Sequence, residues 1–384
     1  MGIASYGNPD ILLEKIKNFI WLDGLKINDG KYQCHWDTRL NLKEDRLFSV
    51  PRHLKVTDNP FQQFVGKYKR EDIAAAGQNV LEKISVELVE RAVNKTKYKK
   101  VCLAGGVAMN VKMNMAIKMS KSVDEVYICP NPADTGAPLG AALYTCIKLM
   151  KEKGIKWTPN RILDSYYGRE YSNKEIEESI KKYRLKSNKI KNPSKVAAEL
   201  IAKGKVIGWF QGRNEYGPRA LGNRSVLADP RRIKIKEKIN KYLKKRDWFM
   251  PFAPSILEDY LGDYVENPTE APFMIMAFKA KREKLKKIPS AIHIDGTLRP
   301  QTVRKNVNKK YYELIDNFRK ITGVPLILNT SFNKHGLPMI MSPDDAMEHI
   351  VRGDIEILII GDYMIDSKVN IKETKIAPEF VDNL

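Results

Sequence analysis

The most informative segment of this chain reads Gly212-Arg213-Asn214-Glu215-Tyr216-Gly217-Pro218-Arg219-Ala220-Leu221-Gly222-Asn223-Arg224-Ser225. Three arginines and three glycines fall within thirteen residues, a pattern that neither a helical nor a strand period explains. Arginine offers a fixed fork of donors to carboxylate or phosphate, and glycine lets such forks converge. A solvated loop is the alternative, but solvated loops usually prefer Lys and Ser. The segment therefore favours an anion site.

A second basic segment follows, Lys244-Lys245-Arg246-Asp247-Trp248-Phe249-Met250-Pro251-Phe252-Ala253-Pro254. Its cations stand beside an aromatic, proline-rich run and are candidates for binding a nucleotide phosphate. Residues 231–246 hold nine Lys and Arg against one Glu, so a solvated basic helix face is the plainer interpretation. We expect such a face for Lys234, Lys236, Lys238 and Lys241.

Two polar segments lie farther along, Asp295-Gly296-Thr297-Leu298-Arg299-Pro300-Gln301-Thr302 and Asn329-Thr330-Ser331-Phe332-Asn333. The second follows an apolar run, 325–328, that predicts a buried strand. Local turn chemistry alone explains such residues. The alternative interpretation is that these residues hold a ligand at the carboxyl end of the strand.

The first half of the chain alternates helical and strand-like patterns. Apolar residues recur at three- and four-residue steps over 72–93, which predicts a helix. Strands at 100–104 and 125–129 and helices ending near 119 and 149 follow. This alternation indicates a layered α/β domain.

Two turns in that half are candidate sites. Gly105-Gly106 after a strand, with Asn110 beyond, is either a phosphate- or ribose-binding turn or a plain strand–helix connection. Asp134, in the loop 131–136, is either a metal ligand or a helix cap, and capping is the commoner fate of a lone Asp.

The second half repeats the α/β pattern after a polar, Lys-rich stretch, 151–193, that is a plausible domain boundary. A helix is predicted at 195–203, with strands at 206–210 and 355–360. Ser342-Pro343 predicts the start of a helix that reaches Val351.

Composition narrows the class of protein. The net charge of +21 attracts anions such as nucleotides, phosphate esters or nucleic acid, without choosing among them. Neither a signal peptide nor an apolar run of the ~20 residues needed to span a bilayer is visible. No cysteine pair has CxxC spacing, and Cys102 and Cys129, in apolar runs, are expected to be buried thiols. We expect a cytoplasmic protein.

Taken in order, these segments resemble the carbamoyltransferase family of the nodulation, cephamycin and tobramycin type. The resemblance covers nearly the whole chain. The matching runs are Gly105 to Asn110, Asp134-Thr135-Gly136 with Gly140-Ala141-Ala142, Gly217 to Ser225, Pro251-Phe252-Ala253-Pro254, and Asn329 to Asn333. The run from Gly217 to Ser225 is the most specific.

The resemblance implies a fold and a reaction. Residues 1–180 would be the C-terminal part of an actin/hexokinase-like domain, and residues 181–384 a YrdC-like α/β domain. The YrdC-like domain would form carbamoyl adenylate from carbamoyl phosphate and ATP. The other domain, with a bound iron (Fe²⁺), would transfer the carbamoyl group to a hydroxyl of a small, sugar-like acceptor.

It also implies roles for individual residues. The YrdC signature maps onto Lys244, Arg246, Ser331 and Asn333, and Asp134 maps onto an iron-ligating aspartate. The expected catalytic residues are Arg219, Arg224, Lys244 and Arg246. The expected nucleotide- or substrate-binding residues are Gly105, Gly106, Asn110, Arg213, Arg299, Ser331 and Asn333. Together the arginines and lysines would neutralise the oxygens of the two phosphate substrates.

One departure from the family pattern affects these expectations. The family has an N-terminal lobe of roughly one domain that carries two histidine iron ligands as HxxxH, and this sequence has no HxxxH. The chain is therefore expected to be a separate subunit of a split gene, a truncated gene or a degenerate copy. Our hypothesis is that a separately encoded lobe completes it, with a homo-oligomer as the other candidate partner, and that apolar surface is exposed without the lobe.

A non-catalytic alternative also fits the charge, namely a basic nucleotide- or RNA-binding scaffold. It is disfavoured because the arginines sit in glycine-rich motifs and not in a stripe with stacking aromatics. A tRNA-modifying relative is disfavoured because the run from Gly217 to Ser225 belongs to the small-molecule branch.

Overall fold

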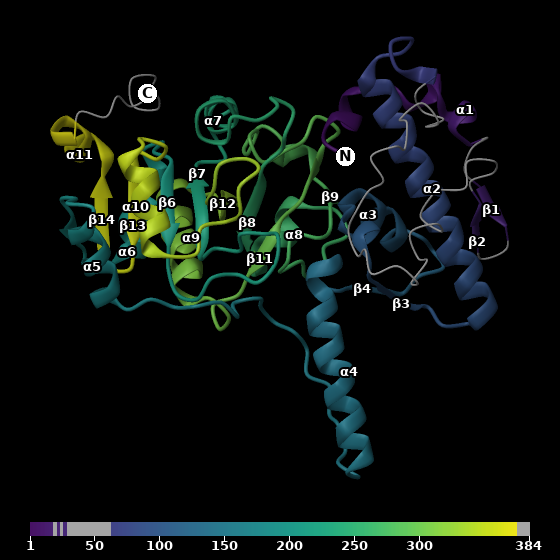
Figure 1. Ribbon diagram of the computed structural model, residues 1–384. Helices are drawn as coiled ribbons and strands as arrows, with labels where there is room; N and C mark the ends of the chain where they lie inside the picture. Colours follow the sequence, from purple (N-terminus) through teal and green to yellow (C-terminus); the bar gives the residue numbers. More distant parts are fainter. Residues whose placement is uncertain (18–20, 24–25, 29–62, 375–384) are drawn as a thin grey trace, which may run out of the picture. The chain divides into compact units, whose positions relative to one another are not determined.

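The computed structural model describes residues 1–17, 21–23, 26–28 and 63–374 (Figure 1). The chain divides into two compact units. One comprises residues 1–103 and 112–127, and the other comprises residues 104–111 and 128–384.

The first unit is organised around the long helix α2 (Arg70–Thr96). Short turns and a helix from the N-terminus pack along it, and Leu12, Ile16, Ala76 and Val80 form their shared apolar core. These elements are η1 (Ile3–Tyr6), η2 (Pro9–Ile11) and α1 (Leu13–Lys17). The remaining elements are the antiparallel pair β1 (Trp21–Asp23) and β2 (Lys26–Asn28), the two-stranded sheet β3 (Lys100–Leu103) and β4 (Glu125–Ile128), and α3 (Val111–Lys118).

An eight-stranded mixed sheet forms the centre of the second unit (Figure 1). Its order is β11-β8-β12-β7-β6-β13-β14-β5, with β11–β8 and β13–β6 parallel and the other neighbours antiparallel. The strands are β5 (Asn188–Lys189), β6 (Ile207–Phe210), β7 (Arg224–Ala228), β8 (Ala253–Leu257), β11 (Gln301–Val303), β12 (Leu326–Ser331), β13 (Ile357–Ile360) and β14 (Tyr363–Asp366). The register pairs Ser331 at the end of β12 with Ser225 at the start of β7, so two of the predicted motifs meet on neighbouring strands.

Helices cover this sheet and end where local chemistry requires. Helix α9 packs against α6, β8 and β12, and α10 packs against β6 and β13. Helix α10 begins with a reciprocal cap between Ser342 and Asp345, and α9 ends at Gly323 in the left-handed conformation. The helices of this unit are α4 (Ala137–Glu152), α5 (Asn173–Lys182), α6 (Pro193–Ala202), α7 (Lys234–Lys238), α8 (Leu261–Tyr264), α9 (Lys309–Thr322), α10 (Pro343–Val351) and α11 (Ser367–Thr374).

Most predicted elements are confirmed within one to three residues at most ends, including the helix begun by Ser342-Pro343. The prediction of buried thiols is wrong, because Cys102 is exposed and Cys129 is only partly buried. Both belong to the region of the two-stranded β3–β4 sheet, whose residues are mostly exposed or half-buried. An apolar run predicts a strand, but it does not predict whether other strands or helices cover that strand.

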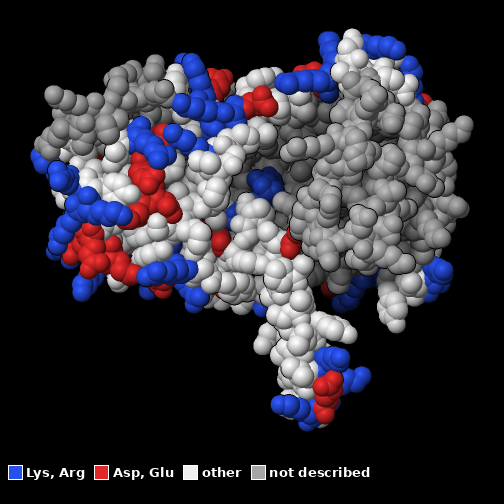
Figure 2. Space-filling model, viewed as in Figure 1, with Lys and Arg blue, Asp and Glu red and all other residues white. Residues whose placement is uncertain are grey.

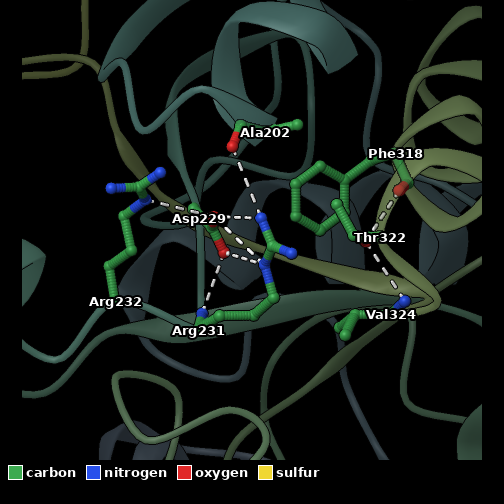
Figure 3. A network of polar contacts seen from close by, with 7 residues as sticks. All are labelled: Ala202, Asp229, Arg231, Arg232, Phe318, Thr322 and Val324. Atoms are coloured by element: carbon green, nitrogen blue, oxygen red, sulfur yellow. Dashed lines mark hydrogen bonds and ion pairs between the residues drawn. The ribbon is translucent and has the colours of Figure 1, made fainter.

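An ion-pair network around the buried carboxylate of Asp229 fixes the turn after β7 (Figure 3). Asp229 is fully buried and accepts hydrogen bonds from the Arg231 backbone N–H at 2.9 Å, from Arg231 Nε at 2.9 Å, and from an Arg231 terminal nitrogen at 2.7 Å. Arg231 also donates to the Ala202 carbonyl at 3.4 Å and lies over the Phe318 ring. The carboxylate raises the pKa of Arg231, so the ion pair joins β7 to α6 and α9.

Replacing Asp229 should destabilise the second unit. Asp229→Asn leaves Arg231, which is partly exposed, beside an uncharged amide and weakens its charge-assisted hydrogen bonds, so we expect the free energy of unfolding to fall by about 2 kcal/mol. Urea denaturation followed by tryptophan fluorescence measures this. Arg232→Ala is the control, because Arg232 is half exposed and 3.4 Å from the same carboxylate, and it should cost less than about 1 kcal/mol. Equal stability of Asp229→Asn and the wild-type chain would contradict the expectation.

Candidate functional site

The loop between β6 and β7 is organised around the buried carboxylate of Glu215. One oxygen of Glu215 accepts the backbone N–H groups of Leu221 at 2.7 Å, Asn223 at 2.8 Å and Arg224 at 3.3 Å. Burial raises the pKa of Glu215, while these N–H groups and the Arg224 guanidinium oppose that rise. No role is predicted for Glu215 from the sequence. Its place inside the arginine- and glycine-rich run was the only signal.

Three neighbouring side chains hold the same loop from its carbonyl side. Trp209 Nε1 donates to the Gly222 carbonyl at 2.8 Å, Gln301 Nε2 to Leu221 at 2.7 Å, and Asn329 Nδ2 to Ala220 at 3.2 Å. Gly222 has a φ of 104°, and a Cβ there would lie 2.2 Å from the Tyr311 ring, so only glycine fits. The backbone next to Arg219 is therefore fixed through its N–H groups by Glu215 and through its carbonyl groups by these three side chains.

Three guanidinium groups gather beside this loop. Burial lowers the pKa of Arg299 well below its ordinary value, and the nearby charges of Arg219 and Arg246 lower it further. Among the described residues we find no carboxylate partner for Arg219 or Arg299, and Arg219 Nε is buried without an acceptor. Because arginine stays protonated in proteins, this is a concentration of positive charge without a counter-ion. Such a cluster binds anions.

Lys244 adds a fourth cation and meets the two residues predicted to act with it. Its side chain is almost fully buried, and Nζ donates to Ser331 Oγ at 3.2 Å, to the Asn333 carbonyl at 2.8 Å and to Asn333 Oδ1 at 2.6 Å, as well as to the Ser331 carbonyl. Burial lowers the pKa of Lys244 to about 7, and the charge of Arg246 contributes. The acceptor oxygens favour the ammonium form and partly offset burial.

An unusual backbone places Arg246. Residues Ile239–Lys244 form a π-helix, and Lys245 follows with a φ of 45°. The chain thereby turns back, so that the Arg246 N–H reaches the Asn240 carbonyl at 3.0 Å and Arg246 Nε reaches Asn240 Oδ1 at 2.7 Å. Single turns of π-helix and left-handed non-glycine residues concentrate at functional sites. Asn240, which the sequence analysis did not single out, positions Arg246.

Two of the predicted arginines lie elsewhere. Arg224 is fully buried, stacks on Phe210, and donates to the carbonyls of Gln211 at 2.8 Å and Arg169 at 3.3 Å. Arg213 donates to the carbonyls of Gly168 at 2.9 Å and Tyr167 at 3.1 Å. Both therefore fasten the segment 167–169 to the β6–β7 loop, and their predicted catalytic and binding roles stay predictions.

The turns at 105–110 and 131–136 meet the same loop. Gly105 N–H donates to the Pro132 carbonyl at 2.6 Å, and Asn131 Nδ2 donates to the Tyr216 carbonyl at 3.1 Å. Gly105 has a φ of 96°, and Gly106 begins a single 3-10 turn that ends at Asn110. Three segments that are far apart in the sequence therefore lie in direct contact.

Asp134 lies in this group, exposed at the start of a 3-10 turn, Asp134–Gly136. Within the described ranges, no three His, Cys, Asp or Glu side chains gather in a way that could hold a metal ion. The described residues thus do not by themselves fit an iron site. Nor does any described helix have the length and apolar character needed to cross a membrane.

Comparison with known proteins agrees with this set of motifs. Residues 198–367 match the family model described as carbamoyltransferase C-terminus, and residues 1–143 match the model described as carbamoyltransferase N-terminus. A solved structure of full-length HypF in its phosphate- and nucleotide-bound form aligns with 45% of this chain and 25% of its own, at a TM-score of 0.34 and 18% identity. That similarity is too low to carry an argument.

The relatives are longer than this chain. An uncharacterized protein of Methanocaldococcus jannaschii is 37% identical over 96% of this chain and 58% of its own length. Nodulation protein NolNO of Sinorhizobium fredii is 36% identical over 96% of this chain and 52% of its own length. Nodulation protein NolO of Bradyrhizobium diazoefficiens is 35% identical over 95% of this chain and 64% of its own length. The chain thus spans between 52% and 64% of the length of these three relatives. On the two family models and these identities, the chain belongs to the carbamoyltransferase family.

Proposed function

We propose that this chain forms carbamoyl adenylate from carbamoyl phosphate and ATP and acts in transfer of the carbamoyl group to a hydroxyl of a small, sugar-like acceptor. The observation that carries the proposal is the cluster of Arg219, Arg246, Arg299 and Lys244, which the described residues leave without a carboxylate. Two phosphate-bearing substrates supply the negative charge that such a cluster lacks.

The reaction balances with one water molecule. Water cleaves carbamoyl phosphate to carbamate and inorganic phosphate. A carbamate oxygen then attacks the α-phosphorus of ATP, the bond from that phosphorus to the bridging oxygen breaks, and pyrophosphate leaves. Finally the acceptor hydroxyl oxygen attacks the carbamoyl carbon, AMP leaves, and the hydroxyl proton passes to a base.

We assign the cations of the cluster to different oxygens of the substrates. Lys244, held by Ser331 and Asn333, is suited to bind the oxygens of the group being activated. Arg219 and Arg299 are suited to bind the phosphate oxygens whose charge increases as pyrophosphate leaves, because guanidinium forks match phosphate geometry. Asn240 keeps Arg246 in line with them.

The domain assignment is part of the same proposal. Residues 181–384, with the mixed sheet and the cation cluster, would be the YrdC-like adenylate-forming domain, and residues 1–180 part of an actin/hexokinase-like transfer domain. Asp134 is the residue of this chain offered to iron, which would polarise a carbonyl or activate a hydroxyl when bound. Among the described residues, Asp134 belongs to no group of three His, Cys, Asp or Glu side chains that could hold a metal ion, so further ligands would have to come from elsewhere.

A partner polypeptide completes the proposal. Helix α4 has no buried residue, although it is apolar around its circumference and charged only near its C-terminal end. Leu143, Tyr144 and Leu149 are 42%, 71% and 50% exposed, which agrees with the expected apolar surface. A helix that is apolar all round is normally enclosed by protein. The part of the relatives that this chain does not match is a source of such a covering lobe.

Exchange of labelled pyrophosphate into ATP tests adenylate formation. We expect the exchange to depend on carbamoyl phosphate. Arg299→Ala should lower the exchange rate by about 100-fold or more, because it removes one preorganised donor to the developing charge. Arg319→Ala, which removes a surface arginine paired with Asp316, is the control and should exchange normally. Absence of exchange together with salt-sensitive RNA binding would favour the basic scaffold instead.

The pH dependence of ATP binding should report Lys244. Its pKa of about 7 means that the ammonium is lost as the pH rises through 7, so ATP affinity should fall between pH 6 and 9. Lys244→Arg should remove this contribution because arginine stays charged. The ratio of the two affinities, measured by calorimetry, cancels the titration of ATP itself. A ratio that does not change with pH would contradict the assignment.

The same ionisation has a consequence for stability. Between pH 7 and 10.5 the unfolded chain holds a proton on Lys244 that the folded chain does not. The contribution of this residue to stability therefore rises with pH across that window.

Complementation tests the partner. The separately purified part of NolO that lies outside its match to this chain should form a complex with it at micromolar concentration. Leu143→Lys with Leu149→Lys should weaken that complex at least about tenfold, because charge replaces apolar contact. Ile321→Lys, at another exposed apolar position, is the control.

Light scattering after size exclusion distinguishes the outcomes. No complex, or one that the double substitution leaves unchanged, contradicts the partner assignment. A dimer of this chain alone that the double substitution disrupts would assign α4 to a second copy.

A further inference from the structure

Lys236 and Lys238 differ from the exposed lysines Lys234 and Lys241 of the basic segment after β7, because both are half-buried. Figure 2 shows Lys and Arg side chains gathered over the α7 region, and Lys234 and Lys241 are exposed there as expected. Lys236 is half-buried, and burial lowers its pKa, followed by the nearby charge of Arg246. The prediction of a solvated face therefore holds for Lys234 and Lys241 and is wrong for Lys236 and Lys238, which are half-buried because their stems lie against neighbouring elements.

Its position follows from the backbone. Lys236 and Asn240 are four residues apart on consecutive helical turns, so they lie on the same face. Asn240 Oδ1 accepts a hydrogen bond from Arg246 Nε at 2.7 Å, which brings the guanidinium onto that face. This arrangement brings the guanidinium of Arg246 to the helix face that carries Lys236, in agreement with the effect of the Arg246 charge on Lys236.

Lys238 faces a different set of groups. The charges that act on it are those of Glu356, Lys205 and Lys368, and Glu356 is already paired with Lys205. Lys236 feels only the weak opposing charge of its chain neighbour Glu237, besides Arg246. No hydrogen bond or ion pair of Lys236 Nζ is found among the described residues. Two half-buried lysines of one helix thus point to different surroundings, and only one adds uncompensated charge to the cluster.

We propose that Lys236 is a fifth cation of the site and binds the terminal phosphates of a nucleoside triphosphate, the part that leaves as pyrophosphate. Lys244 is almost fully buried and engaged by Ser331 and Asn333, so it marks the inner end of the cluster. Lys236 is more exposed and marks the outer end. A leaving pyrophosphate has to pass from the inner end to solvent, so its oxygens belong at the outer end.

The inference rests on the proposed function for the identity of the nucleotide, but not for the binding of a polyphosphate. Removing one charge-assisted contact to phosphate should weaken binding about tenfold or more. A cation that contacts only the outer phosphates affects ATP and inorganic tripolyphosphate, and it does not affect AMP.

Calorimetric titration with sodium tripolyphosphate, ATP and AMP at constant salt tests this assignment. Lys236→Ala should weaken tripolyphosphate and ATP at least tenfold and AMP less than twofold, while Lys236→Arg stays close to the wild-type chain. Lys234→Ala removes the same charge from an exposed position of the same helix and should change each affinity less than twofold. Thermal melts of each variant confirm that it is folded.

The possible results separate the two proposals. The assignment is overturned if Lys236→Ala behaves like Lys234→Ala, if it weakens AMP as much as ATP, or if the wild-type chain binds no tripolyphosphate. Polyphosphate binding that depends on Lys236 without pyrophosphate exchange would support the fifth cation and refute adenylate formation. Exchange that Lys236→Ala leaves unchanged would support adenylate formation and refute the role of Lys236.

Discussion

The candidate site depends on one buried carboxylate. Glu215 Oε1 accepts the N–H groups of Leu221, Asn223 and Arg224, while Oε2 is buried without a partner among the described residues. A buried acceptor is costly unless it is hydrogen-bonded, so the three bonds to Oε1 hold these N–H groups around one point. These hydrogen bonds therefore specify a single path for the loop. Arg219 leaves that path beside Arg299, and Arg224 leaves it toward the interior.

The arginines of one short motif consequently have different surroundings. Arg224 and Arg213 donate hydrogen bonds to backbone carbonyls and hold the segment 167–169 in place. Arg219 keeps a buried nitrogen without an acceptor. The first two stabilise the loop, and the third is available to an anion. A motif that is dense in arginine therefore combines structural and ligand-binding groups, which composition alone does not separate.

Gathering Arg219, Arg246, Arg299, Lys244 and Lys236 is unfavourable for folding, because like charges repel more strongly where solvent is excluded. The surrounding structure offsets that repulsion. Neighbouring strands of the mixed sheet fix the ends of the loops, the Asp229–Arg231 pair ties the next turn to two helices, and Asn240 holds Arg246. An anion bound at the cluster would relieve the repulsion that remains, and the proposed ligand binding would then stabilise the fold.

The sequence by itself determined the kind and order of the elements, since apolar periodicity marked the helices and strands and Ser342-Pro343 marked a helix start. It also predicted that Lys244, Ser331 and Asn333 act together, and the structure brings these three residues into contact, while their role in binding an anion stays a prediction. Only the tertiary structure decided which arginines lie near one another, that Lys236 is half-buried, that Glu215 and Asn240 hold the loop and Arg246, and that Cys102 and helix α4 are uncovered. The physical reason is that periodicity reports local conformation and the presence of an apolar face, whereas convergence and burial depend on strand register, loop path and what packs against each face.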